Sequence, residues 1–139
     1  MNIEIRYFSK TGNTKKLADA IALATGTEAK TVNQPLLGKT DILFLGSSVY
    51  AAGVDEEIKA FIKSLDKEQI GHVVNFSTAA LLPSTYKQVE KLLKQRGILL
   101  DTNEFHCRGS FHMMHKGKPD KEDLEAVKKF AKQVVERYQ

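Results

Sequence analysis

The sequence contains little that could form a cross-link or a metal cluster. Cys107 is the only cysteine among 139 residues, so an internal disulfide and a cysteine-based metal cluster are both excluded. No apolar run approaches the roughly 20 residues that a helix needs to cross a bilayer. The N-terminus leads almost directly into a predicted strand, without the pattern of a signal peptide. We therefore expect a reduced, cytoplasmic protein with no membrane span.

A marked excess of charge of one sign is also missing. Lys and Arg number 21 against 17 Asp and Glu, which gives a formal net charge of +4. Basic and acidic residues alternate along the predicted helices, without a basic stripe interleaved with aromatics, so no nucleic-acid partner is expected. The length and a hydrophobic content of 42% predict one domain over residues 1–139 with a sizeable core.

Apolar patterning predicts strands and helices in alternation. Strands are expected over residues 3–8, 28–32, 42–45, 73–76 and 105–107. Helices are expected from the end of the 9–14 loop to residue 25, and over residues 55–65, 84–96 and 120–138. Alternation of this kind predicts an α/β fold, a doubly wound, five-stranded parallel sheet flanked by helices. Ligands of such sheets bind beyond the carboxyl ends of the strands, so the loops after the first, third and fourth strands should converge.

The loop after the first predicted strand has the composition of a phosphate site. It reads SKTGNT over residues 9–14 and runs into a helix whose first backbone N–H groups lack intrahelical partners. The spacing G-x-x-x-x-G-K-[ST] of a triphosphate loop is absent here. Neutral hydroxyl and amide donors suit a single phosphate monoester bound without a metal. A plain N-cap of the helix is the alternative explanation of the hydroxyl residues.

The SKTGNT loop, followed by the helical stretch KKLADAIA, resembles the phosphate loop of the flavodoxin family, and GSSVY over residues 46–50 resembles a second loop of that family. The resemblance covers essentially the whole chain. It implies the strand order 2-1-3-4-5, noncovalently bound FMN and electron transfer. By the same resemblance, the expected cofactor-binding residues are Ser9, Lys10, Thr11, Gly12, Asn13, Thr14, Ser48, Val49, Tyr50, Ala51, Gly53, Ser77, Thr78 and Ala79.

The resemblance also implies roles for residues in the loops after the third and fourth strands. Tyr50 is expected to flank the isoalloxazine ring, and packing over the following helix is its alternative role. A peptide at Gly53, or elsewhere in residues 51–53, would reorient to accept a hydrogen bond from flavin N5. Ser77 and Thr78 would bond the ribityl chain or the phosphate. The family often supplies a second stacking aromatic after the fourth strand, and residues 77–83 contain none, which predicts that one face of the ring is more open.

The segment over residues 107–117 is the least conventional part of the chain. The pair His112 and His115 has the spacing H-x-x-H with no acid among these residues, and it does not by itself predict a metal site. Cys107, at the end of a strand, is expected to be a small buried hydrophobe rather than a nucleophile. Three apolar residues would either cover the flavin ring or form a surface for a partner or substrate: Phe111, Met113 and Met114.

Three classes of function remain open from the sequence. The first is an electron carrier, and the second is an FMN-dependent oxidoreductase that reduces a quinone or another small substrate. The third is a flavodoxin-fold domain that no longer binds FMN. Electron carriers of this family are usually strongly acidic, and the net charge of +4 departs from that pattern. The expected partner is a redox protein or a small-molecule electron acceptor.

Overall fold

The chain folds around one parallel sheet of five strands. The computed structural model describes residues 1–50 and 53–139. The strands are β1 (Ile3–Tyr7), β2 (Ala29–Thr31), β3 (Thr40–Val49), β4 (Ile70–Ala79) and β5 (Phe105–Arg108). They lie in the order β2-β1-β3-β4-β5, and each pair is parallel. The predicted fold class and strand order are therefore confirmed.

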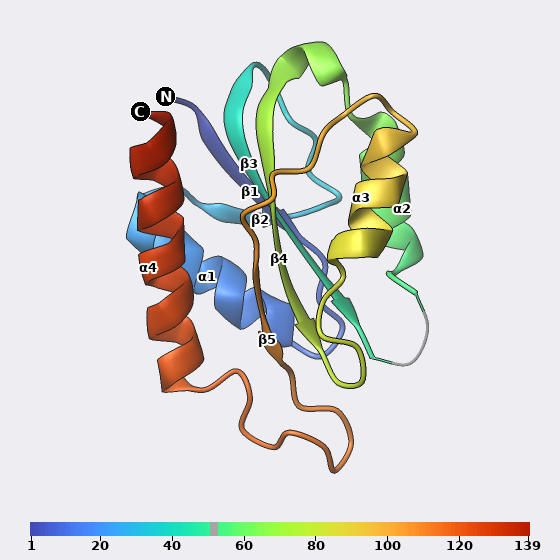
Figure 1. Ribbon diagram of the computed structural model, residues 1–139, viewed down its shortest axis with the longest axis vertical. Helices are drawn as coiled ribbons and strands as arrows, with labels where there is room; N and C mark the ends of the chain where they lie inside the picture. The colour runs from blue at the N-terminus through green and yellow to red at the C-terminus, as the bar shows by residue number, and fades with distance from the viewer. Residues whose placement is uncertain (51–52) are drawn as a thin grey trace.

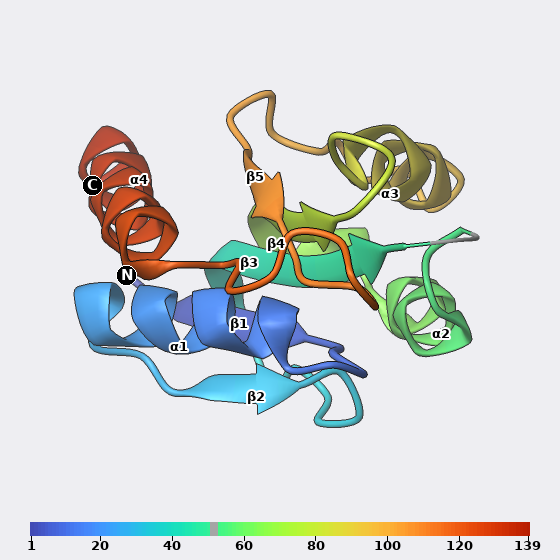
Figure 2. The same cartoon turned by 90° about the horizontal axis from the view of Figure 1, so that it is seen from below.

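Two helices cover each face of the sheet. Figures 1 and 2 show α1 (Asn13–Thr25) and α4 (Lys121–Tyr138) on one side, and α2 (Glu56–Ser64) and α3 (Tyr86–Lys94) on the other. Successive residues of β3 point to opposite faces, because side chains alternate along a strand. Phe44 packs in the cluster under α1 and α4, whereas Leu43 and Leu45 pack in the cluster under α2 and α3. Burial on both faces explains why this strand is a continuous apolar run.

The connection between β2 and β3 contains no helix, as the sequence predicts. It is held by the guanidinium of Arg6, a residue of β1 that is only 1% exposed. This group donates hydrogen bonds to the carbonyl oxygens of Gln34 (2.7 Å) and Pro35 (3.1 Å), and it pairs with Glu4 at 3.1 Å. A loop thus stands where a helix would otherwise cover the outer strands of the sheet on the α2 side.

Strands β3 and β4 are longer than the sequence predicts, and this is the main correction to the predicted boundaries. The other elements begin and end within two residues of their predicted bounds. Pairing of β3 with β4 continues through Ser48 opposite Thr78 and Val49 opposite Ala79, so residues 46–49 and 77–79 lie in strands rather than loops. Gly46 does not end β3. It makes room for the Phe76 ring, which would lie 2.3 Å from a Cβ atom at position 46.

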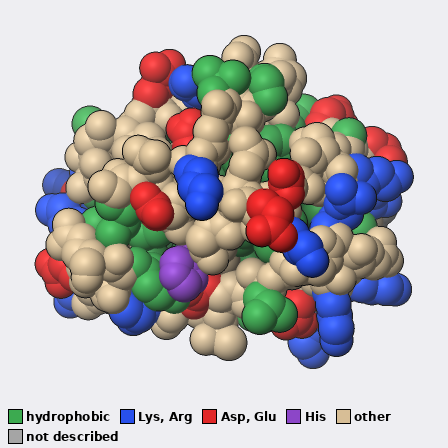
Figure 3. Space-filling view, turned by 90° about the horizontal axis from the view of Figure 1, so that it is seen from above, with side chains coloured by type: hydrophobic (Ala, Val, Ile, Leu, Met, Phe, Trp, Pro, Cys, Tyr) green, Lys and Arg blue, Asp and Glu red, His purple; other side chains and the backbone are tan. Residues whose placement is uncertain are grey.

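The surface at the end of the molecule where both termini lie carries charges of both signs. In Figure 3 the Lys and Arg side chains are interspersed with Asp and Glu side chains. Within residues 1–50 and 53–139, no helix is both long enough and apolar enough to span a bilayer.

Replacing Gly46 by Ala tests the close packing of the sheet. We expect Gly46→Ala to lower the free energy of unfolding by about 1–3 kcal/mol, because the new methyl group would overlap the fully buried ring of Phe76. Urea denaturation followed by circular dichroism measures the change. Gly38→Ala is the matched control, since that position is exposed and open, and its effect should stay within about 0.5 kcal/mol. Equal effects of the two variants would contradict this account.

Candidate functional site

The 9–14 loop leaves the start of α1 open to an anion. The backbone N–H of Gly12 donates to the Ser9 hydroxyl oxygen at 3.0 Å, and Gly12 adopts a left-handed conformation with φ of 90°. The N-cap residue is Gly12, which has no side chain, so no hydroxyl of the loop caps α1 from the N-cap position. The first turn of α1 also contains no acidic residue. Its N–H groups and partial positive charge therefore favour a bound anion.

The remaining side chains of this loop differ in accessibility. Lys10 is 70% exposed and pairs with Asp55, the N-cap residue of α2, at 3.3 Å. Thr11 is exposed, so its hydroxyl is accessible to a ligand, whereas Asn13 and Thr14 are buried at the start of α1. The loop thus combines accessible donors at its tip with buried polar groups at its base.

Four polar side chains from three parts of the chain form one hydrogen-bonded group, which we call the hydroxyl cluster: Asn13, Thr14, Tyr50 and Thr78. The Thr78 hydroxyl lies 2.9 Å from the Thr14 hydroxyl and 2.7 Å from the Tyr50 hydroxyl. The side-chain amide of Asn13 donates to the Tyr50 hydroxyl at 2.9 Å. The carboxyl ends of β1, β3 and β4 therefore converge at this cluster, as the fold class predicts.

Other predicted residues take different positions. The Ser77 hydroxyl accepts a hydrogen bond from the backbone N–H of Thr85 at 3.3 Å, so it faces the start of α3 and away from the hydroxyl cluster. The backbone of Ser48, Val49 and Ala79 is held in the paired ends of β3 and β4. Gly53 is exposed next to Val54, whose N–H donates to the side chain of Gln88. Ala51 lies outside the described residues.

The segment after β5 closes over the hydroxyl cluster, and sequence analysis missed most of its contacts. It crosses the carboxyl ends of the strands in Figure 2. The carbonyl of Ser110 accepts a hydrogen bond from the Asn13 amide at 2.8 Å. Gly109 approaches so closely that a Cβ atom there would lie 2.3 Å from the Tyr50 hydroxyl. A glycine two residues beyond the predicted strand over residues 105–107 was the available signal for this close approach.

The aromatic and basic residues of the same segment also have defined contacts. The Phe111 ring stacks on Tyr50 with a centroid distance of 5.2 Å and an angle of 8° between the planes. The His115 ring lies 3.1 Å from the carbonyl oxygen of Ala80, and Arg108 donates to the same oxygen at 2.9 Å. In the part of the chain that the structure describes, no three His, Cys, Asp or Glu side chains are grouped to hold a metal ion.

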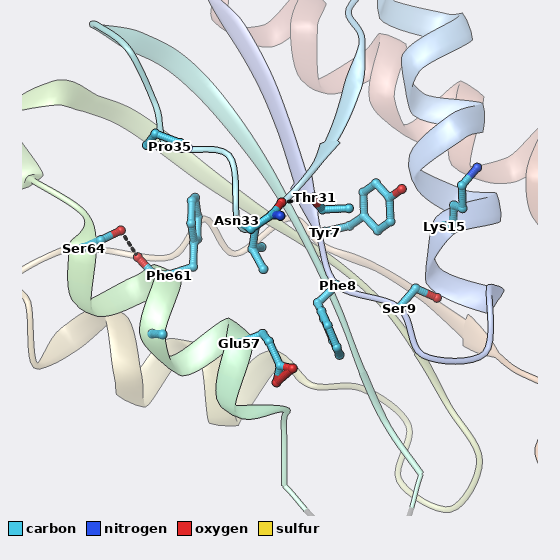
Figure 4. Close-up of a pocket in the computed structure, with 12 residues that line it drawn as sticks. Tyr7, Phe8, Ser9, Lys15, Thr31, Asn33, Pro35, Glu57, Phe61 and Ser64 are labelled. Atoms are coloured by element: carbon cyan, nitrogen blue, oxygen red, sulfur yellow. Dashed lines mark hydrogen bonds between the residues drawn. The ribbon is translucent and has the colours of Figure 1, made fainter.

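A separate cavity of about 740 Å³ opens on the α2 side of the sheet, beside the first strand (Figure 4). It lies next to the helix-free connection between β2 and β3. Of the predicted cofactor-binding residues that the structure describes, only Ser9 lines it. Aromatic rings from β1 and its end and from α2 form much of its wall, and its lining includes Tyr7, Phe8, Lys15, Val32 and Phe61. The short connection in the sequence did not by itself predict a cavity.

The fold defines a class, the doubly wound α/β domains, whose ligands bind at the carboxyl ends of their strands. The sequence model of the flavodoxin domain family matches residues 4–113, and the chain belongs to this family. It is therefore a flavodoxin-type flavoprotein, and the family implies a flavin cofactor. A comparison with curated protein sequences found no match.

Solved structures agree with this fold. The chain is similar to an archaeal flavodoxin, with a TM-score of 0.80, 15% identity and 99% of each chain covered. It is also similar to oxidised flavodoxin 2 from Bacillus cereus, with a TM-score of 0.74 and 20% identity over 99% of this chain and 100% of the other. A flavodoxin from Streptococcus pneumoniae gives a TM-score of 0.66 at 15% identity, with 99% of each chain covered. At these identities the likeness shows the fold.

Cys107 in β5 should be unreactive in the folded protein. Its side chain is partly buried against the core under α1 and α4, and burial, with Asp123 nearby, raises the pKa of its thiol to about 12. At pH 8 we expect an aromatic disulfide reagent to modify the folded protein roughly a hundredfold more slowly than the urea-unfolded chain, where the pKa is ordinary. Absorbance of the released thiolate measures both rates. Equal rates would contradict the burial of this thiol.

Proposed function

We propose that this chain binds FMN noncovalently around the hydroxyl cluster and passes electrons between redox partners. The observation that carries the proposal is the position of that cluster, which links the ends of three strands directly beside the uncapped start of α1. The start of α1 suits the phosphate of such a ligand, and the polar groups along the strand ends suit the polyhydroxyl chain that follows the phosphate.

The donors present fit a phosphate monoester. Ser9 and Thr11 offer hydroxyls, and the first turn of α1 offers backbone N–H groups without competition from an acidic side chain. Of the two expected ribityl contacts, Ser77 faces α3, whereas Thr78 belongs to the hydroxyl cluster, which supports Thr78 as the contact to the ribityl chain. Tyr50 would lie against the flat ring. When bound, FMN supplies the one- or two-electron chemistry, while the chain binds it, orients it and limits access of water.

The charge of the chain favours an acidic partner. A formal net charge of +4 attracts a negatively charged redox protein and speeds its association, and added salt weakens that attraction. The proposed electron carrier therefore differs in the sign of its charge from the usual acidic shuttles that the sequence resembles.

Titrations with FMN and riboflavin test the phosphate site. The wild-type protein should bind FMN much more tightly than riboflavin, which lacks the phosphate. Thr11→Ala should weaken FMN binding by about tenfold and leave riboflavin binding unchanged, because it removes one hydrogen bond to a charged group. Quenching of flavin fluorescence measures both affinities.

Thr102→Ala is the matched control for this test. It removes an exposed hydroxyl in the segment that precedes β5, at the opposite end of the sheet, and should change neither affinity. Failure of the wild-type protein to bind FMN would overturn the proposed function. An equal loss of FMN and riboflavin binding in Thr11→Ala would place the phosphate elsewhere.

The cavity on the α2 side favours a second candidate function, an FMN-dependent oxidoreductase acting on a quinone or another small substrate. Its volume of about 740 Å³ lies in the range of sites for small organic molecules, and its wall is partly aromatic. It adjoins the proposed phosphate loop at Ser9. A substrate held there would lie beside the proposed cofactor site.

Filling the cavity tests this second function. Ala60→Trp places a large ring at the cavity wall in α2 and should reduce quinone reduction by a reduced nicotinamide several-fold, with FMN affinity unchanged. Leu23→Trp is the control, because residue 23 on α1 is 77% exposed and remote from the cavity lining. If the FMN-loaded wild-type protein shows no turnover of the quinone, the oxidoreductase function is rejected and the electron-carrier function remains.

A further inference from the structure

The cavity on the α2 side has walls that the fold itself holds in place. The turn over residues 32–35 forms one rim, and the backbone N–H of Val32 donates to the carbonyl of Tyr7 at 2.9 Å. Arg6 donates to two carbonyl oxygens of the same turn, at 2.7 and 3.1 Å. On the wall formed by α2, Phe61 is buried. The cavity is therefore largely formed before a ligand enters it, as is usual for small-molecule sites.

Aromatic rings form the middle of this cavity. In Figure 4, Phe8 at the end of β1 lies between the side chains of α1 and those of α2, and Phe61 of α2 lies beyond it. The ring of Tyr7 adds a third aromatic group to the lining. Such rings favour a flat aromatic ligand, because ring pairs gain stacked or edge-to-face contacts in addition to buried area. The volume of about 740 Å³ accommodates a bicyclic aromatic molecule.

One end of the cavity carries hydrogen-bond donors. Lys15, in the first turn of α1, lies 2.8 Å from Asp19, and both side chains are about half exposed. Asp19 and, less strongly, Tyr7 raise the pKa of Lys15, so its ammonium group is charged at neutral pH. An ammonium group has three N–H donors, so Lys15 can keep Asp19 and still bind a ligand. Figure 4 shows the Tyr7 hydroxyl on the same side, and together these donors suit a carboxylate.

The other end of the cavity carries a carboxylate. Glu57, in the first turn of α2, lines the cavity on the side away from Lys15 in Figure 4. Within residues 1–50 and 53–139 its carboxylate has no ion-pair partner, whereas the adjacent Glu56 pairs with Lys59 at 3.2 Å. An ionised carboxylate only accepts hydrogen bonds, so it favours a hydroxyl or amino group and repels a second anion. The two ends of the cavity therefore suit different chemical groups.

We propose that this cavity binds a flat aromatic acid that carries a hydroxyl or amino group at the end of its rings opposite the carboxylate. The carboxylate of the ligand lies at Lys15 and the Tyr7 hydroxyl, its rings lie against Phe8 and Phe61, and its donor group lies at Glu57. This inference deepens the second candidate function and rests on the assignment of the cavity to a small molecule. It does not require bound FMN. For that function, it selects substrates with an acidic group over neutral ones.

Three naphthalene probes test the two ends of the cavity separately: 6-hydroxy-2-naphthoate, 2-naphthoate and 2-naphthol. The full chain should bind 6-hydroxy-2-naphthoate most tightly. Loss of the carboxylate or of the hydroxyl should each weaken binding by roughly tenfold, because each removes a hydrogen bond to a charged group. Fluorescence anisotropy of the probes measures the affinities, and the chain contains no tryptophan whose emission could overlap. Equal affinities for all three probes would overturn the proposal.

Two variants assign the ends of the cavity to single residues. Lys15→Gln should weaken 6-hydroxy-2-naphthoate by about tenfold and leave 2-naphthol unchanged, since only the acid contacts the ammonium group. Glu57→Ala should weaken 6-hydroxy-2-naphthoate without weakening 2-naphthoate. Lys16→Gln and Glu56→Ala are the matched controls, because both residues are exposed, adjoin the tested ones and do not line the cavity. A loss in Lys16→Gln as large as in Lys15→Gln, or no loss in Lys15→Gln, would refute the assigned orientation.

Added FMN separates this proposal from the proposed function. Saturating FMN should leave the affinity for 6-hydroxy-2-naphthoate essentially unchanged. Displacement of the probe by FMN would place the probe in the cofactor site and overturn the inference. A chain that binds FMN but none of the probes would also overturn it, while the proposed function stands. A chain that binds 6-hydroxy-2-naphthoate through Lys15 but binds no FMN would overturn the proposed function and leave this inference supported.

Discussion

The hydroxyl of Thr78 is the point on which the arrangement of the site depends. It lies 2.9 Å from the Thr14 hydroxyl and 2.7 Å from the Tyr50 hydroxyl, and therefore joins the start of α1 to the ends of β3 and β4. Thr14 and Thr78 are fully buried, and a buried polar group left without a partner costs about 1–3 kcal/mol. Each of these residues therefore constrains the position of the others, and the proposed ligand would meet polar groups that the fold has already placed.

The helix-free connection between β2 and β3 gives the molecule a second feature, independent of the hydroxyl cluster. Arg6 anchors that connection to β1 through the carbonyl oxygens of Gln34 and Pro35. The connection leaves an open cavity bounded by the ends of β1 and β2 and by α2. The proposed cofactor site is covered by the segment after β5, whereas the neighbouring cavity is open. This asymmetry is the physical basis for considering both an electron carrier and an enzyme.

Much of the fold was predictable because its signals are local. The apolar run before the SKTGNT loop and the helical spacing after it correspond to β1 and α1 of the structure. The strand ends were less predictable. Gly46, Ser48 and Ser77 are residues typical of turns, yet backbone pairing across β3 and β4 continues through them. A neighbouring strand can override a local turn preference, since the ladder satisfies the backbone groups of both segments.

By itself, the sequence determined the order of elements, and the position and the hydroxyl and amide donors of the 9–14 loop. These properties depend on residues close together in the chain. Tertiary structure alone decided which side chains meet. Ser77 faces α3 and Thr78 faces α1, because consecutive residues of a strand point to opposite sides of the sheet and the register of β4 sets which residue takes which side. Likewise, Phe111 reaches Tyr50 only because the parallel sheet brings the ends of β3 and β5 to the same edge.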